Sequence, residues 1–394
     1  PTSPTTQRSS DFRFQQEIRG AEVQATGQRE LWGWGHLVTY GISGDVTSTS
    51  RPRDRTETTL ANGAVTRVIS SEVYPNKNFP DTNTTQASAY IQDIATYGRL
   101  RVIPAIRFDH YRLDPNPDQA FANSNIRNFT IEAQRHTAVS PKLGVTYDLT
   151  DEMRVFGQYA RGFRAPPYDN ANFGFSNPVF RYEILPNGDL QPETSDSFEA
   201  GLRGRFADGS SFQVSGFYNL YRDFLETKVV GTTPQGLTQF QYQNLARVRI
   251  YGVEARGDWH FAQGWALFGS LALARGQDQE TGLPIDSVDP LTGIAGLRYQ
   301  SVAGWGGEVR VRAVAGKDRV SDASFVRTDA FATFDALLFY EVSSNLSVNL
   351  GVFNIADRRY FNPQDVVGVQ AANPNLELFR ATGRTVAMNA TVRW

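Results

Sequence analysis

Residues 155–204 hold the densest group of side chains in this sequence that could bind a ligand. Three arginines, Arg161, Arg164 and Arg181, could pair with carboxylates, because the planar guanidinium matches carboxylate geometry. Several prolines fix φ and stiffen the segment. Among them lie five aromatic residues: Tyr168, Phe173, Phe175, Phe180 and Tyr182. These rings could form a surface that contacts a ligand or a loop core that packs on itself, and the sequence leaves both open.

Composition excludes several other kinds of chemistry. The 394 residues include no cysteine, so disulfides, cysteine–zinc sites and thiol nucleophiles are absent. There is no G-x-S-x-G elbow, H-E-x-x-H helix or P-loop, and we expect no enzyme. The 39 basic and 41 acidic residues nearly balance, which gives no basic footprint for nucleic acid. The acidic segments 114–119 and 278–289 could hold calcium, although such loops are usually only solvated.

A period of two recurs along the chain. It is present at residues 142–149, 253–261, 308–313, 346–352 and 385–394, and it predicts β-strands with one apolar and one polar face. Strands with one entirely polar face, which carries charges such as Glu254, Arg256 and Asp258, are more typical of a barrel with a water-filled lumen than of a soluble β-sandwich. We therefore expect one set to face lipid, namely Val253, Ala255, Trp259, Val348, Leu350, Val386 and Val392. The set expected to face the lumen is Glu254, Arg256, Asp258, Asn349 and Asn389.

The connections between these strands alternate in length. Tight turns at 150–152, 207–210, 262–264 and 343–345 alternate with long polar links at about 50–83, 114–135, 165–193, 276–290 and 362–383. Loops above ~12–15 residues are uncommon in compact soluble domains, whereas outer-membrane barrels combine short periplasmic turns with long extracellular loops. Mean hydropathy is −0.40, and no apolar run approaches the ~18 residues of a membrane-spanning helix. The sequence predicts an all-β fold, a transmembrane antiparallel β-barrel.

Counting strands suggests a partial barrel. About fifteen strands are predicted, while single-chain bacterial barrels normally have an even number. If Trp394 ends at the periplasmic side, the first predicted strand, at about residues 11–26, runs towards the periplasm. We therefore expect residues 1–394 to form one domain, the C-terminal part of a larger barrel that does not close on its own. A porin of about sixteen strands is the alternative.

Five motifs carry a family resemblance. They are FRAPPYDN (163–170), PNGDLQPETSDSFEAGLRG (186–204), YQNLARVRIYGVEARGDW (242–259), GVFNIADRRYFNP (351–363) and the terminal GRTVAMNATVRW (383–394). In this order they resemble TonB-dependent outer-membrane receptors, and within them the haem and haemoglobin receptor branch. The resemblance implies a barrel of ~22 strands around an N-terminal plug. This chain would supply the last ~15 strands, without the plug and the TonB box.

The same resemblance implies a function. The protein would be a ligand-gated, TonB-energised uptake receptor in the bacterial outer membrane, in contact with lipid and lipopolysaccharide. Its cargo would be haem or a haem-carrying protein such as haemoglobin or a haemophore, with haem as transported ligand and no intrinsic cofactor. The TonB complex would act through the plug. A ferric-siderophore receptor and a passive porin or structural barrel are the alternatives.

The histidine pattern departs from this branch. Such receptors usually place an iron-ligating histidine between the FRAP and NPNL boxes, and none lies between Phe163 and Leu190. His36 and His260 are expected near the periplasmic turns. His110 and His136 flank the long link 114–135, and only His136 shares the parity of the lumen-facing Lys142.

If the cargo is haem, we expect Tyr182 to ligate the iron, with Tyr168 second and His136 third. Tyr182 lies where the family usually keeps its histidine, and a tyrosinate can be an axial haem ligand. In that case Arg161, Arg164 and Arg181 could pair with the haem propionates, since guanidinium matches carboxylate geometry, and Phe173, Phe175 and Phe180 would form the apolar wall against the porphyrin face. The competing interpretation is that Tyr182 packs inside the loop.

Overall fold

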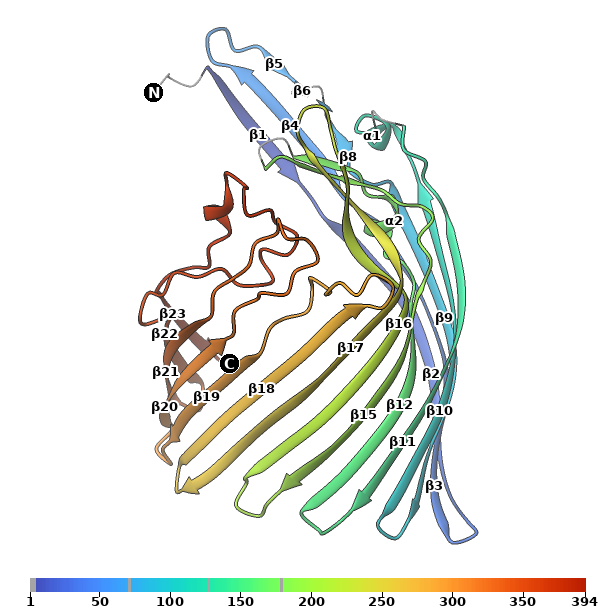
Figure 1. Ribbon diagram of the computed structural model, residues 1–394, viewed down its shortest axis with the longest axis vertical. Coiled ribbons are helices and arrows are strands. Elements are labelled where there is room, and N and C mark those ends of the chain that lie inside the picture. The colour runs from blue at the N-terminus through green and yellow to red at the C-terminus, as the bar shows by residue number, and fades with distance from the viewer. Residues whose placement is uncertain (1–4, 70–71, 126–127, 178–179) are drawn as a thin grey trace.

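The computed structural model describes residues 5–69, 72–125, 128–177 and 180–394 and is almost entirely β (Figure 1). Within these residues, no helix has the length and apolar sequence needed to cross a membrane. Fifteen of the described strands form one large curved antiparallel sheet, each hydrogen-bonded to its neighbour in the following order. They are β2 (Gln15–Leu31), β3 (Trp34–Ser50), β9 (Asp81–Tyr97), β10 (Leu100–Asn116), β11 (Gln134–Asp148), β12 (Met153–Arg164), β15 (Glu193–Arg205), β16 (Ser211–Thr232), β17 (Thr238–Ala262), β18 (Trp265–Asp278), β19 (Thr292–Gln300), β20 (Trp305–Val314), β21 (Phe331–Ser343), β22 (Leu346–Phe353) and β23 (Thr385–Val392).

The sheet curves as a barrel wall does, and its two outermost strands are β2 and β23. The register pairs of the described strands join β2 to β3 and β23 to β22, and none joins β2 to β23. Every residue of β2 and β23 is exposed. The predicted antiparallel barrel wall of about fifteen strands is confirmed.

Short turns gather at one end of the sheet and long loops at the other (Figure 1). The β2–β3 turn is typical of the short end: Trp32 and Gly33 have φ of 52° and 77°, as a tight hairpin turn with right-handed strand twist requires. We call this the turn end and the opposite side the loop end. The five predicted long links all lie at the loop end. Four of them are within a few residues of their predicted bounds, and the fifth begins at residue 354, eight residues before its predicted start.

The two faces of the sheet differ as the alternation predicts. In register, Asn349 lies opposite Asn389 and Leu350 opposite Met388, so polar and apolar residues form separate rows. One face, the polar face, carries side-chain bonds such as that from Arg310 Nε to Asp335 Oδ2, at 3.0 Å. The other, the apolar face, exposes Val253, Trp259, Val386 and Val392 among its large side chains. The predicted separation of the two residue sets onto opposite faces is confirmed.

Aromatic residues border the apolar face at two heights. Near the turn end, ring centroids lie 4.8 Å apart for Trp265 and Tyr299 and 5.2 Å apart for Tyr299 and Trp305; we call this the lower aromatic belt. The upper aromatic belt is the row Tyr159, Phe198, Tyr218 and Tyr251. Along β17, Tyr251 of the upper aromatic belt and Trp259, which lies on the same face towards the turn end, are eight residues apart. This spacing suits a tilted strand that crosses an apolar layer ~25 Å thick.

The loop end has its own small elements. Here one expectation is wrong, and one long link had not been predicted. Residues 6–12 form β1, which pairs with β4, so the first strand of the wall begins at Gln15 rather than near residue 11. The long link between β20 and β21 was not predicted. The elements are β1 (Thr6–Phe12), β4 (Pro52–Thr59), β5 (Val65–Thr66), β6 (Val68–Ile69), β7 (Glu72–Val73), β8 (Asn76–Lys77), α1 (Gln119–Ala122), α2 (Tyr168–Asn172), β13 (Phe175–Asn177), β14 (Tyr182–Leu185) and η1 (Leu376–Phe379).

Candidate functional site

A cleft of about 720 Å³ lies among the loops at the loop end, and we call it the loop cleft. Segments that are far apart in the sequence form its walls: residues 12, 51, 53 and 55 at the β1–β4 pair, residues 72 and 78 after it, residues 121, 124, 125, 129 and 131 around α1, and residues 172, 174–177 and 183–186 of the FRAP–NPNL segment. Its arginines are Arg51, Arg53 and Arg55, and its aromatic rings are Phe12, Phe121, Phe129 and Phe175. The cleft therefore combines positive charge with flat apolar walls.

Arg53 and Arg55 of the loop cleft stack on an aromatic ring and donate to neutral side chains, and Arg53 also has a carboxylate nearby. The guanidinium carbons of Arg53 and Arg55 each lie 5.0 Å from the ring centroid of Phe12. Buried Arg53 donates to Asn78 Oδ1 and lies 3.7 Å from Glu72 Oε1. Arg55 Nε donates to Ser10 Oγ at 2.9 Å.

Two of these guanidinium groups are available to a ligand. Within the described part of the chain, neither Arg51 nor Arg55 forms an ion pair with a carboxylate. Of the two carboxylates that line the cleft, Glu183 accepts a bond from Gln239 Nε2 at 2.6 Å and Glu72 lies beside Arg53. Because guanidinium groups bind carboxylates and other planar anions well, the cleft can accept an anionic ligand.

A chain of six neighbouring rings leads from the loop core to the loop cleft. Successive centroids are 4.9 Å apart for Tyr168 and Phe79, 6.4 Å for Phe79 and Phe173, and 6.0 Å for Phe173 and Phe175. Phe175 and Phe240 then each lie 6.2 Å from Tyr182. Phe79 is fully buried and Phe175 lines the cleft, so this aromatic chain connects packed core at Phe79 to the cleft wall at Phe175, and Tyr182 and Phe240 continue it beyond the cleft wall.

The two predicted tyrosines have different surroundings. Tyr182 begins β14, which runs parallel to residues 238–241 of β17, and its side chain is half-buried. No hydrogen bond to its hydroxyl occurs within the described residues. Burial raises the pKa of Tyr168, and the carboxylate of Asp169 raises it further. The neutral phenol is therefore favoured at Tyr168, which weakens it as a tyrosinate ligand.

The predicted arginines do not gather in one place. Arg164 Nη1 lies 3.0 Å from Oε2 of buried Glu193, whose other oxygen accepts from the backbone N–H of Leu225 at 2.9 Å. Arg161 is three residues earlier on the same strand, so it lies on the apolar face, in register with Asp196. Neither residue lines the loop cleft.

Arg181 lies beside the β16–β17 hairpin, and Phe180 contacts its own loop. Arg181 is exposed with φ of 57°, and its carbonyl accepts from the backbone N–H of Thr238 at 2.9 Å. The backbone N–H of Phe180 donates to Asn177 Oδ1 at 3.3 Å. Among the predicted aromatic residues, Phe175 is the one that forms part of the cleft wall.

The histidines lie outside the loop cleft. His136 stacks on Tyr111 with centroids 6.3 Å apart, and its Nε2 is buried without a hydrogen-bond partner in the described chain. It lies on the same face as Lys142, as predicted. His36 Nδ1 lies 2.6 Å from Asp93 Oδ2, and His260 adjoins the turn at 207–210, both near the turn end. The described residues contain no group of three or more His, Asp or Glu that could hold a metal ion.

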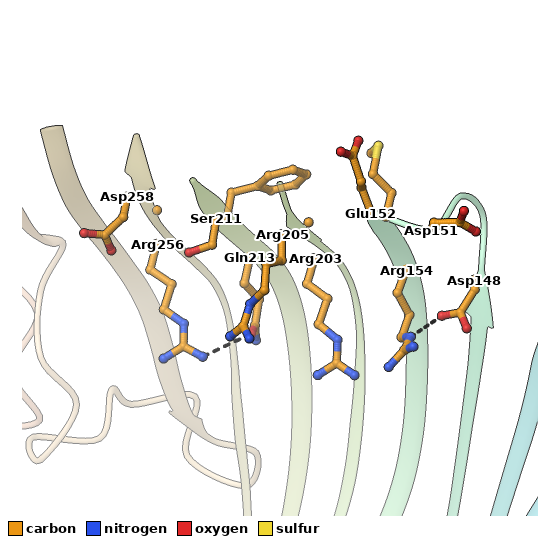
Figure 2. Close-up of a pocket in the computed structure, with 14 residues that line it drawn as sticks. Asp148, Asp151, Glu152, Arg154, Arg203, Arg205, Ser211, Gln213, Arg256 and Asp258 are labelled. Atoms are coloured by element: carbon orange, nitrogen blue, oxygen red, sulfur yellow. Dashed lines mark hydrogen bonds and ion pairs between the residues drawn. The ribbon is translucent and has the colours of Figure 1, made fainter. Parts of the chain in front are cut away.

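A second hollow of about 720 Å³ lies on the polar face near the turn end. Figure 2 shows the guanidinium groups of Arg154, Arg203 and Arg256 projecting from neighbouring strands in one direction. Arg154 bonds Asp148, and Arg256 Nη2 donates to Gln213 Oε1 at 3.1 Å. This hollow is far from the loops, and we assign it to the polar lining of the sheet.

Sequence reasoning missed the arginines of the loop cleft. The signal was present in RPRDR, residues 51–55, because three arginines at intervals of two share one side of an extended chain. No comparable sequence pattern indicated that Phe12 and Phe129 would line the cleft, because these two residues come from different segments that are far apart in the sequence.

Comparison with known proteins shows which family has this architecture. The model of the family described as TonB dependent receptor-like, beta-barrel matches residues 2–355. Hemoglobin and hemoglobin-haptoglobin-binding protein A of Haemophilus influenzae is 26% identical over 284 residues, which cover 64% of this chain and 26% of that protein. The chain therefore spans about a quarter of the length of this relative.

Two solved structures have a similar fold. The copper transporter OprC superposes with a TM-score of 0.71 at 18% identity, over 97% of this chain and 57% of that one. The Serratia marcescens hemophore receptor HasR, solved with its hemophore HasA and heme, superposes with a TM-score of 0.67 at 17% identity, over 97% of this chain and 60% of that chain. The fold and the family match agree: the chain belongs to the family of TonB-dependent receptor β-barrels.

Proposed function

We propose that this protein is an outer-membrane, ligand-gated and TonB-energised uptake receptor whose cargo is haem or a haem-carrying protein. The loop cleft is the observation that carries the proposal. Haem is a flat apolar ring system with two carboxylates, and the cleft pairs aromatic walls such as Phe129 and Phe175 with Arg51 and Arg55, which have no carboxylate partner in the described chain.

The surroundings of the cleft support the same proposal. The apolar face between two aromatic belts suits the lipid of an outer membrane, with the loop end outside the cell. The similar proteins named above include a haemoglobin-binding protein and a hemophore receptor solved with heme. Coupling to TonB and contact with lipid and lipopolysaccharide follow from the family as parts of the proposal.

A ferric siderophore is the second candidate cargo. Among the described residues, no histidine lines the loop cleft, and a siderophore brings its own iron ligands. An anionic ferric chelate would use the same two free arginines. The iron ligand contributed by the protein therefore distinguishes the two cargoes.

The test is nutritional. The complete open reading frame is expressed in a bacterium that lacks its own haem receptors, with haem or haemoglobin as the sole iron source. We expect growth that requires a functional TonB. Growth on ferric siderophores alone would favour the second candidate, and growth on haem that is independent of TonB would indicate a passive pore.

A further inference from the structure

The apolar face carries a groove of about 740 Å³ across β15–β18. The upper aromatic belt, with Phe198, Tyr218 and Tyr251, borders it towards the loop end. The next row towards the turn end contains Ala200, Gly216 and Val253, where small side chains leave space. A Cβ added at Gly216 would meet nothing nearer than the carbonyl oxygen of Gly252, at 3.8 Å. The groove is therefore open to the outside of the sheet and lined mainly by apolar side chains.

Arginines surround the end of the groove that lies towards the loops. Arg275 is itself part of the lining and lies beside Tyr251 in register. One row above the upper aromatic belt is Arg249, and one row higher Arg222 lies directly opposite Arg247. With Arg161 on β12, these residues share the parity of the apolar face, and we call them the arginine rim: Arg161, Arg222, Arg247, Arg249 and Arg275.

Among the described residues, one ion pair with a carboxylate is formed by the five arginines of the arginine rim. Like charges directly opposite each other across two strands are destabilising, and Arg222 and Arg247 form such a pair. The carboxylate recorded near them is Asp196, 3.7 Å from Arg222 Nη2. Arg249 Nη2 donates to Gln277 Oε1 at 2.7 Å, while its buried Nε has no hydrogen-bond partner in the described chain. The rim thus presents several donors to an anion from outside the chain.

We propose that groove and rim together bind one phosphorylated lipid of the outer leaflet, with phosphate on the arginine rim and an acyl chain in the groove. Guanidinium groups bind phosphate in a bidentate manner, which would relieve the repulsion between Arg222 and Arg247. Aromatic belts mark the level of lipid headgroups, so rim and groove stand where phosphate and acyl chain of one lipid lie. The inference rests on the proposed outer-membrane location and is independent of the haem cargo.

Native mass spectrometry of the delipidated complete receptor tests this, with diphosphoryl lipid A as probe. Arg222→Gln/Arg247→Gln should weaken its binding about tenfold or more. Gly216→Leu, which fills the groove and leaves the rim intact, should also weaken it. Arg112→Gln/Arg135→Gln is the matched control, because these residues also lie directly opposite each other on the apolar face, away from the groove, and Arg112 already pairs with Asp114. It should leave binding unchanged.

Three results would overturn the proposal. Equal binding of dephosphorylated lipid A would exclude phosphate recognition. An equal loss in the control variant would show diffuse attraction to charge, and unchanged binding in both test variants would place the lipid elsewhere. Haem titration of the same samples separates the two proposals. A variant that binds haem normally but no longer prefers the phosphorylated lipid would affect the lipid proposal and leave the proposed haem cargo unaffected.

Discussion

The ring of Phe175 lies 6.2 Å from the ring of Tyr182 and also forms part of the wall of the loop cleft. This contact joins the predicted iron ligand to the place where Arg51 and Arg55 offer positive charge. In the proposed haem complex, the propionates would contact Arg51 and Arg55 in the cleft, and Tyr182 would approach the iron from behind Phe175.

Replacing Tyr182 by Phe should abolish a tyrosinate-type absorption spectrum of bound haem. The substitution keeps the ring contacts with Phe175 and Phe240 and removes only the oxygen. Tyr168→Phe is the matched control and should leave the spectrum unchanged, because burial raises the pKa of Tyr168 and favours the neutral phenol. A Tyr182→Phe variant with unaltered spectrum and affinity would exclude Tyr182 and leave His136 or a siderophore cargo.

Neighbouring residues of β18 should differ sharply in their tolerance of charge. Leu271 lies on the apolar face opposite Ala255, and Ala272 lies on the polar face opposite Glu254. Leu271→Arg should lower the free energy of unfolding of the bilayer-inserted protein by ~2–4 kcal/mol, and Ala272→Arg should lower it by much less. Reversible denaturant unfolding in lipid vesicles measures both, and the opposite order would mean that the faces are assigned the wrong way round.

Lys77 should anchor the loops that form one wall of the cleft. Its buried ammonium lies 2.7 Å from Asp81 Oδ2 and 2.6 Å from Asp118 Oδ2, and Asp118 also caps α1. Lys77→Met removes both charged bonds and should destabilise this loop region locally by about 2 kcal/mol. Amide exchange of Phe121, whose N–H donates to Asp118 Oδ1, reports the change. Equal exchange in both proteins would show that the anchor contributes nothing.

The same anchor should depend on pH in a defined direction. Burial is the largest single effect on Asp118 and would raise its pKa, but the hydrogen bond and the charge of Lys77, together with the hydrogen bond from the backbone N–H of Phe121, outweigh it, and the pKa is lowered from 3.8. Burial alone would lower the pKa of Lys77, but its bonds to Asp118 and Asp81 outweigh this and the pKa is raised from 10.5.

A lowered carboxyl pKa gives stabilisation that is present above pH 3.8 and lost as the pH falls through the folded value. A raised lysine pKa gives stabilisation that is present below pH 10.5 and lost as the pH rises through the folded value. The protection of Phe121 by the anchor should therefore be constant at neutral pH, and wild type and Lys77→Met should converge in strong acid. A difference that persists well below pH 3 would contradict this linkage.

The period of two was sufficient to predict the wall. On β17, apolar or small residues alternate with charged residues from Val253 to Asp258, so both the strand and its two faces could be assigned. The segment QRSSDF of β1 has no apolar face, and nothing in it indicated that it pairs with β4 instead of starting the wall. Patterns of burial thus predict strands whose two sides meet different surroundings.

The site was less predictable, because its walls come from distant segments. Arg161 and Arg164 were grouped by closeness in the sequence, although a spacing of three on a strand puts them on opposite faces. The arginines at 51, 53 and 55 had the correct spacing, but their meeting with Phe129 and Phe175 depends on non-local packing of loops. Periodicity alone contains no information about such contacts.

The most direct test of this account is a haem titration of the purified complete receptor, followed by absorbance. Arg51→Gln/Arg55→Gln should raise the Kd for haem about tenfold or more, because each propionate loses a guanidinium partner. Arg8→Gln is the control, since Arg8 pairs with Glu57 at 2.5 Å on the β1–β4 pair and does not line the cleft. The account predicts tight binding by wild type and control and weak binding by the cleft variant. Equal affinity in all three proteins, or no haem binding by the wild type, would contradict it.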